Sequence, residues 1–270
     1  MQTVRNRVAD ILGIDLPIVQ APMNYIAGHA LAAAVSAAGG MGVLGPNAGK
    51  VQGEEISMRE RTLREFARIR EVTDKPVGIN VVVPDGENKA ALMYARSTVE
   101  AAAEGGATAA FCVGGLQPTI FELIKEKGMK LIVRPLTPTV KNAREAQAMG
   151  ADIFVATGYD AGGFLPSHHT GTFSIVPTIV DAVTIPVLAA GGINDLRGVR
   201  AAFALGAEGV YVGTRFIATN ECAANDHAKE LICKLSGSNL LYVDETQRSL
   251  PTEFAAEAYV KHRLAPTVPT

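Results

Sequence analysis

The chain of 270 residues carries 25 basic and 27 acidic side chains, a formal net charge of −2, and no tryptophan. A balanced charge without a basic stripe argues against nucleic acid and anionic membranes as partners, and leaves a small molecule as the expected ligand. The three cysteines, Cys112, Cys222 and Cys233, lack CxxC spacing. This pattern is typical of reduced thiols and predicts neither a disulfide framework nor a metal site.

The start of the chain shows no targeting signal. Residues 1–13 contain Arg5, Arg7 and Asp10 and no apolar core, so they do not resemble a signal peptide. The longest weakly polar stretch, residues 30–43, is interrupted by Ser36 and by glycines, and it is too short to span a bilayer. We therefore expect a cytoplasmic protein.

Short apolar, β-branched segments alternate with helical segments along the chain. We expect eight strands, at residues 18–23, 41–45, 77–83, 109–114, 131–135, 153–157, 187–191 and 209–213. Helices are expected between them at about 29–38, 58–72, 88–104, 118–127, 138–149, 174–182 and 195–205, and after the last strand at about 223–235. Glycines such as Gly128 and Gly150 follow several helical segments, where helices commonly end.

The order of these elements predicts the fold class. Continuous apolar strands separated by helices indicate a parallel sheet covered by helices. Eight such units in 270 residues predict an α/β fold closed into a TIM (β/α)8 barrel, which usually has about 250 residues. An open doubly wound sheet is the alternative. We assign residues 1–236 to the barrel; residues 237–270 are expected to pack on it or to form a lid or interface arm, which leaves a homodimer open.

Glycine turns end the last two predicted strands. Gly191 and Gly192 follow one strand and Gly213 and Thr214 the next, and 22 positions, about one β/α unit, separate Gly191 from Gly213. In TIM barrels the loops after strands seven and eight commonly bind phosphate, because glycines let backbone N–H groups approach the anion. Tight turns without a ligand are the alternative. We expect a phosphorylated ligand at this pair.

Six segments at or near the predicted strand ends form a recognisable set. They are IVQAPM at 18–23, AVSAAGGMG at 34–42, GIN at 78–80, DAGG at 160–163, IPVLAAGGI at 185–193 and LGAEGVYVGTRF at 205–216. In this order they resemble the flavin-dependent nitronate monooxygenases, once called 2-nitropropane dioxygenases, and the related flavin-dependent enoyl-acyl-carrier-protein reductases. Each is weak alone, but the set in this order is specific. The resemblance extends from about residue 10 to residue 220.

The resemblance implies a barrel that holds FMN non-covalently. It implies that the FMN phosphate binds backbone at Gly191, Gly192, Gly213 and Thr214, that the segment Ala21, Pro22 and Met23 passes the flavin ring, and that Asn80 hydrogen-bonds the cofactor. FMN also needs side-chain partners for its ribityl chain and ring edge, and Asn80 with Asp160 can supply them. Gly162 and Gly163, in the same loop as Asp160, are expected to bind the cofactor too. For Asn80 and Asp160 a capping or turn role is the alternative, and for Met23 a place in the core.

The chain departs from the family pattern in its sixth loop. In both relatives a histidine directly follows the double glycine and looks like the proton-handling residue of the monooxygenases, whereas this chain has Phe164 there. His168 and His169 come shortly afterwards. A histidine suits removal of a proton next to a nitro group because its pKa lies near neutral pH, so these two are the candidate catalytic residues. A nitronate, which is already deprotonated, would need no such base.

The leading hypothesis is an FMN-dependent enzyme of the nitronate monooxygenase type, which oxidises an alkyl nitronate or a similar small carbanion-like substrate with dioxygen. One alternative is an FMN-dependent enoyl-(acyl-carrier-protein) reductase using NAD(P)H. Another is a flavin-binding barrel with altered catalysis, as Phe164 suggests. A flavin-free nucleotide dehydrogenase with a loop cysteine is disfavoured because the sixth loop has no cysteine.

Overall fold

The computed structural model describes residues 6–264. Residues 1–5 of the predicted barrel segment 1–236 and residues 265–270 of the predicted C-terminal segment 237–270 lie outside the described residues. Eight parallel strands form one sheet in the order β1-β9-β8-β6-β5-β4-β3-β2. A bridge between Val19 and Met41 joins its two ends, β1 and β2. The predicted TIM barrel is therefore confirmed, and the open-sheet alternative is wrong. The strands are β1 (Ile18–Gln20), β2 (Gly42–Leu44), β3 (Val77–Val83), β4 (Ala109–Gly114), β5 (Lys130–Arg134), β6 (Ile153–Thr157), β8 (Val187–Ala190) and β9 (Gly209–Val212).

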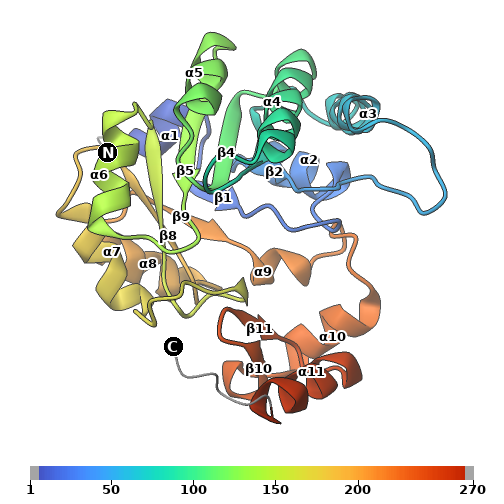
Figure 1. The fold of residues 1–270 in the computed structure, drawn as a ribbon, viewed down its shortest axis with the longest axis vertical. Coiled ribbons are helices and arrows are strands. Elements are labelled where there is room, and N and C mark those ends of the chain that lie inside the picture. The colour runs from blue at the N-terminus through green and yellow to red at the C-terminus, as the bar shows by residue number, and fades with distance from the viewer. Residues whose placement is uncertain (1–5, 265–270) are drawn as a thin grey trace.

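Helices connect successive strands and lie around the sheet (Figure 1). They are α2 (His29–Ala37), α3 (Met58–Arg70), α4 (Lys89–Glu104), α5 (Pro118–Glu126), α6 (Val140–Ala148), α7 (Thr172–Val180) and α8 (Leu196–Ala204). Local sequence fixes their starts. Ser57 and Glu60 form a capping box at α3, and the Thr139 side chain accepts from the Asn142 amide at α6.

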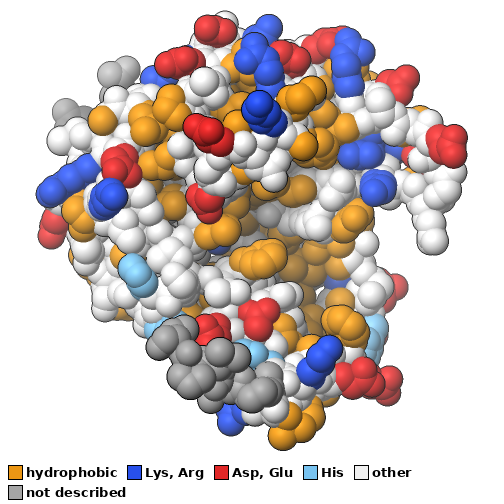
Figure 2. Space-filling view, in the orientation of Figure 1, with side chains coloured by type: hydrophobic (Ala, Val, Ile, Leu, Met, Phe, Trp, Pro, Cys, Tyr) orange, Lys and Arg blue, Asp and Glu red, His pale blue; other side chains and the backbone are white. Residues whose placement is uncertain are grey.

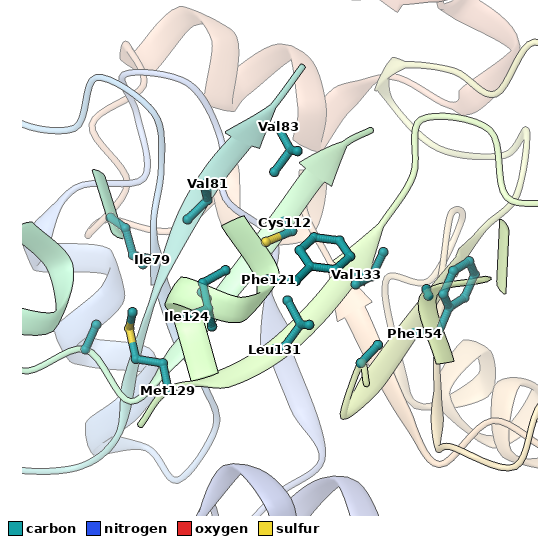
Figure 3. Close-up of a cluster of buried hydrophobic side chains, with 14 of the residues drawn as sticks. Ile79, Val81, Val83, Cys112, Phe121, Ile124, Met129, Leu131, Val133 and Phe154 are labelled. Carbon is teal, nitrogen blue, oxygen red and sulfur yellow. The ribbon is translucent and has the colours of Figure 1, made fainter. Parts of the chain in front are cut away.

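Side chains of alternate strand residues form two separate buried layers. The outward layer packs against the helices; in Figure 3, Phe121 and Ile124 of α5 lie beside Cys112, Leu131 and Val133 of β4 and β5. The inward layer fills the barrel and includes Val19, Val43, Phe111, Ile132, Ile153, Val155, Leu188 and Tyr211. Burying each large apolar side chain contributes about 1.5–3 kcal/mol to folding. The barrel interior is therefore a packed core below its upper rim.

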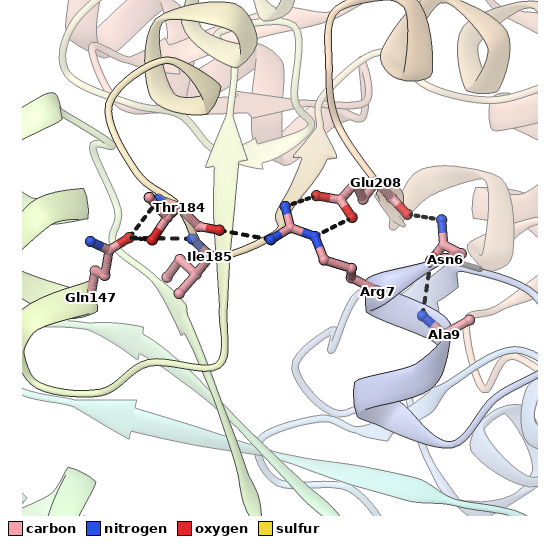
Figure 4. A network of polar contacts seen from close by, with 7 residues as sticks. All are labelled: Asn6, Arg7, Ala9, Gln147, Thr184, Ile185 and Glu208. Carbon is pink, nitrogen blue, oxygen red and sulfur yellow. Dashed lines mark hydrogen bonds and ion pairs between the residues drawn. The ribbon is translucent and has the colours of Figure 1, made fainter. Parts of the chain in front are cut away.

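A short N-terminal helix closes the end of the barrel at which the strands begin. In α1 (Arg7–Leu12), Val8 and Leu12 are buried in the inward layer. Arg7 donates to the carboxylate of Glu208 and, at 2.8 Å, to the Thr184 carbonyl (Figure 4). The Glu208 hydrogen bond raises the pKa of Arg7. With this end plugged, a ligand can enter the barrel only from the carboxyl ends of the strands.

The C-terminal segment attaches to the barrel through the loop that follows β6. Strand β7 (Gly163–Phe164) in that loop pairs with β11 (Gln247–Ser249), which pairs with β10 (Leu241–Asp244), all antiparallel. Helix α11 (Glu253–Leu264) packs against β10. In Figure 1 this segment, together with α10 (Asp226–Lys234), lies at the bottom of the view, on the side of the barrel opposite to α1. The sequence predicted α10 but not the hairpin or α11.

Other differences from the predicted elements are local. Strand β1 ends at Gln20 instead of residue 23, because Pro22 has no N–H to donate to a ladder. The short helices α1 and α9 (Thr214–Ile217), and the 3₁₀ turn at Gly237–Asn239, were not predicted. Among the described residues, no helix combines the length and the apolar character needed to cross a lipid bilayer.

Candidate active site

Three loops converge where β6, β8 and β9 end. A Cβ atom added to Gly191 would lie 3.1 Å from the Ala161 amide nitrogen, and one added to Gly192 would lie 3.1 Å from the Asp160 Cβ. A Cβ on Gly162 would lie 3.0 Å from the Thr214 hydroxyl. The loop after β6 therefore lies directly against both glycine turns. We call these three loops, residues 158–163, 191–192 and 213–214, the glycine cradle.

The double-glycine turn needs glycine at both positions. Gly191 has φ +104° and Gly192 φ +70°, backbone angles that residues other than glycine rarely adopt. A Cβ on Gly191 would also lie 2.8 Å from the Thr172 hydroxyl and 2.9 Å from the Gly158 carbonyl oxygen. The turn therefore requires residues without side chains, as a backbone phosphate-binding turn does. Phosphate binding by Gly191, Gly192, Gly213 and Thr214 stays a prediction.

Asp160 has a structural role within this cradle. Its carboxylate accepts a 2.6 Å hydrogen bond from the amide of Thr172, the first residue of α7. Thr172 in turn donates through its hydroxyl to the Gly191 carbonyl at 3.0 Å. Asp160 therefore caps α7 and, through Thr172, ties that helix to the glycine turn. The sequence analysis considered Asp160 only as a local capping or turn residue, whereas the N-cap position of α7 is Gly171 and the Asp160 contact is made from a distant loop. Cofactor binding by Asp160 stays a prediction.

The segment after β1 lies beside the last glycine turn. The Ala21 amide donates to the Val212 carbonyl at 2.8 Å. The Cβ position of Gly213 is 3.6 Å from the Ala21 Cβ and 4.0 Å from the Met23 sulfur. Ala21, Pro22 and Met23 thus form one wall next to the cradle, where the predicted flavin ring would pass. Gln20 fixes this edge, since its buried side chain accepts from the Val43 amide at 2.9 Å.

Polar side chains gather at the upper rim of the barrel. By alternation from Ile153 and Val155, Thr157 belongs to the inward layer at the end of β6. Its hydroxyl is buried and has no hydrogen-bond partner among the described residues. Asn80 of β3 is 5% exposed, but of these two side chains only Thr157 contributes a buried atom without a partner. Buried polar groups are normally satisfied, so the Thr157 hydroxyl fits a rim that a polar ligand completes.

An arginine that the sequence analysis missed lies at the same rim. Arg134 ends β5 two residues after the inward-facing Ile132, so its side chain belongs to the inward layer. Its half-buried guanidinium makes no ion pair in the described part of the chain, and burial lowers its pKa. Burial raises the pKa of its neighbour Tyr211. Strand alternation was the signal that could have found Arg134, because it places this residue on the same face of β5 as Ile132.

Together these features give a phosphate-sized cradle of bare backbone, an apolar wall, an unpartnered hydroxyl group and a cation at the open end of a barrel. A flavin nucleotide requires this set of groups. The residues present therefore fit the cofactor.

Comparison with known proteins decides the family. The model of the family described as nitronate monooxygenase matches residues 5–267. The chain belongs to the nitronate monooxygenase family. This confirms the resemblance seen in the sequence, and the family is one of flavin-dependent oxidoreductases.

Relatives within and around the family differ in the activities their names give. The chain is 34% identical to a (3aS,4S,5R,7aS)-5-hydroxy-7a-methyl-1-oxo-octahydro-1H-indene-4-carboxyl-CoA dehydrogenase of Rhodococcus jostii, over 85% of this chain and 60% of that protein. It is 31% identical to a probable nitronate monooxygenase of Staphylococcus saprophyticus, over 84% of this chain and 72% of that protein. The structure of FabK from Thermotoga maritima superposes with a TM-score of 0.82 at 33% identity, covering 96% of this chain and 78% of that one. The chain thus spans about three fifths of the length of the dehydrogenase.

The two candidate histidines lie in the loop that follows β6. His168 and His169 are exposed, and the His169 ring stacks on Tyr159 with 4.4 Å between ring centroids. Neither ring makes a hydrogen bond or ion pair among the described residues. Phe164, in the place of the family histidine, is 64% exposed and pairs through its backbone with Gln247. A catalytic role for His168 or His169 stays a prediction.

The C-terminal hairpin fixes the loop after β6, which the sequence did not reveal. The Arg248 guanidinium of β11 donates to the Asp160 carbonyl at 2.6 Å and to the Ala161 carbonyl. It also lies over the ring of Tyr242, which stacks on Tyr159. Arg248 thus binds two carbonyl groups of the loop after β6, while the Ala161 amide nitrogen of the same loop lies near Gly191. The hairpin therefore packs directly against the glycine cradle.

Proposed function

We propose that the chain is an FMN-dependent oxidoreductase of the nitronate monooxygenase type, which oxidises an alkyl nitronate or a similar small carbanion-like substrate with dioxygen. The observation that carries this is the glycine cradle beside a rim with Asn80, Arg134 and the unpartnered hydroxyl of Thr157, in a chain of this family. FMN, when bound, would accept electrons from the substrate and pass them to dioxygen.

Each part of the site has a task in this proposal. Gly191, Gly192, Gly213 and Thr214 bind the phosphate through backbone and hydroxyl donors. Gly162 and Gly163 let the loop after β6 approach the cofactor closely. Asn80 and Thr157 hydrogen-bond the flavin, and the wall of Ala21, Pro22 and Met23 excludes water from its ring.

The charge at the rim supports an anionic substrate. Arg134 is a half-buried cation without an acidic partner among the described residues, so it favours a negative charge at the mouth. The two loop histidines are exposed, and the one placed by a contact is stacked on Tyr159. We therefore propose that the substrate arrives already deprotonated and that His168 and His169 are not required to remove its proton.

A second candidate is an oxidoreductase that acts on an acyl thioester, including the reductase that uses NAD(P)H. The observation in its favour is the 34% identity to a protein named as a carboxyl-CoA dehydrogenase.

Anaerobic mixing of the FMN-loaded chain with single reductants tests the proposal. We expect an alkyl nitronate to bleach the flavin and the neutral nitroalkane to do so far more slowly, with the His168→Ala and His169→Ala variants unchanged. NADH and NADPH are expected to leave the flavin oxidised. Bleaching by NAD(P)H but not by nitronate would favour the thioester candidate. A flavin that none of these compounds reduces would indicate a binding protein.

A further inference from the structure

Two residues other than glycine have a left-handed backbone in the described part of the chain, and both lie in loops at the open end of the barrel. Tyr25, in the loop after β1, has φ +64°, and Asn47, in the loop after β2, has φ +55°. Asparagine adopts this conformation readily, whereas it is costly for a bulky aromatic residue. Such costly conformations cluster at functional sites, where the surrounding structure enforces them. The turn alone does not require a tyrosine, so its side chain is the feature to explain.

Hydrogen bonds from two neighbouring segments fix the loop that carries Tyr25. The Tyr25 amide donates to the Pro46 carbonyl at 2.9 Å, and the Asn47 side chain donates to that of Asn24 at 3.0 Å. From the other side, the Ala223 amide donates at 3.1 Å to the carbonyl of the residue that follows Tyr25. The loop after β2 and the segment after α9 thus hold Tyr25 in its left-handed conformation.

This conformation leaves the tyrosine ring in solvent beside the apolar wall. Met23 and Ala27, two residues to either side, pack into a buried cluster with Leu31 and Cys222. Tyr25 does not belong to that cluster and is 50% exposed. An aromatic side chain held in this way has apolar surface available to a ligand at the open end of the barrel.

Further apolar side chains are exposed on the same side of the mouth. Val81 and Val83 belong to the outward layer, so Val82 at the end of β3 points inward, and it is 48% exposed. Tyr94 of α4 is 45% exposed. Val82 and Tyr94 line one cavity, together with polar residues of α3 and with Pro46, which accepts from the Tyr25 amide. Figure 2 shows hydrophobic side chains inside the hollow between the barrel and the C-terminal segment.

The opposite side of the mouth is polar. Arg134 ends β5 and Thr157 ends β6, and the buried Thr157 hydroxyl has no partner among the described residues. In the closed order of the sheet, β5 lies opposite β1 and β6 lies opposite β2. The cation and the hydroxyl therefore face the loops that carry Tyr25 and its anchor. A ligand with an anionic head and an alkyl tail matches this division.

We propose that Tyr25 is a specificity-determining residue, whose ring binds the alkyl group of an anionic substrate with its head on the Arg134 side. The inference rests on the proposed function for the identity of the reactants. Contact with the ring removes methylene groups from water, so each added methylene strengthens binding. The substrate class is therefore a straight-chain alkyl nitronate with several methylene groups.

Straight-chain alkanoates, from acetate to octanoate, are the probe, because they carry the charge of a nitronate and do not react. Their binding to the FMN-loaded chain is followed by flavin absorbance. We expect the unmodified chain to bind about threefold more tightly per added methylene. Tyr25→Asn, which suits the left-handed backbone but lacks the ring, should abolish most of this gain, and Tyr25→Phe should keep it. The control Phe254→Asn removes an 81% exposed ring of α11 and should also keep the gain.

Thermal unfolding separates a binding role of Tyr25 from a structural one. Tyr25→Asn should unfold at an unchanged or higher temperature, because asparagine adopts a positive φ at lower cost. The proposal is overturned if the unmodified chain shows no gain per methylene, if Tyr25→Asn keeps the gain, if Tyr25→Phe loses it, or if Tyr25→Asn unfolds at a clearly lower temperature. Flavin reduction by nitronates without a gain along the alkanoates would contradict this inference alone. A gain without reduction would contradict the proposed function alone.

Discussion

At the residue scale, the chain keeps unsatisfied polar groups at one rim of an otherwise apolar barrel. Thr157 is one such group. Its buried hydroxyl has no partner, although an unsatisfied buried group costs about 1–3 kcal/mol. Such a group is expected where a ligand completes the hydrogen bonding.

We expect Thr157→Val to stabilise the flavin-free chain by about 1 kcal/mol and to weaken FMN binding about tenfold, because one desolvated donor is lost. Chemical unfolding and flavin fluorescence titration measure the two effects. Thr108→Val, which removes a hydrogen bond to the Val77 carbonyl, is the control and should change neither in this direction. A destabilised Thr157→Val variant with normal FMN binding would show that the hydroxyl is structural.

The rim residues differ in how far the sequence predicts them. Asn80 and the glycine pair at 191 and 192 follow apolar runs directly, so their position at strand ends could be inferred from local pattern. Arg134 also ends a strand. Whether an acidic partner lies near it depends on which residues the other strands of the barrel bring to the rim, and the local sequence around Arg134 does not show this. The hydrogen bond from the Thr172 amide to Asp160 spans 12 positions and was not predicted, since only a local capping or turn role was considered for Asp160.

At the element scale, helix α8 begins directly after the double-glycine turn and depends on Asp195. The Asp195 carboxylate accepts from the Arg197 side chain and from the Arg197 and Gly198 amides, which lowers its pKa to about 2. A depressed pKa contributes stability that is present above the ordinary value and is lost as the pH falls through about 2. We expect Asp195→Ala to lower the unfolding temperature at pH 7 and the difference to vanish near pH 2. A difference that persists at that pH would contradict this origin.

The hairpin of β10 and β11 is the element that braces the cradle. We expect Arg248→Met to increase hydrogen exchange at residues 158–165 and to weaken FMN binding about tenfold, since hydrogen bonds from a charged donor contribute about 1.5–3 kcal/mol. Arg263→Met, which removes a contact with the Tyr259 ring, is the matched control on α11. Unchanged hydrogen exchange at residues 158–165 of the Arg248→Met variant would show that Arg248 does not hold this loop in place. The sequence could not predict this contact, because 88 positions separate Arg248 from Asp160.

At the scale of the whole molecule, α1 closes the end of the barrel where the strands begin. The opposite, open end carries the two glycine turns, the apolar wall and the cationic rim. The eight strands could be predicted because each is a continuous apolar run between turn residues. The C-terminal segment could not, because its strands are short and half-buried, and β11 pairs with the distant β7 while β10 pairs with β11. The site is therefore predictable where one strand end carries it, and unpredictable where distant segments meet.

The affinity of the flavin-free chain for FMN compared with riboflavin tests the central claim most directly. If the glycine turns bind the phosphate, FMN should bind at least about 100-fold more tightly, which is about 2.7 kcal/mol. Gly191→Ala should remove most of that difference, whereas Gly53→Ala, with a similar positive φ but no atom within 4 Å of its Cβ, should keep it. Equal affinity for FMN and riboflavin in the unmodified chain would contradict the account.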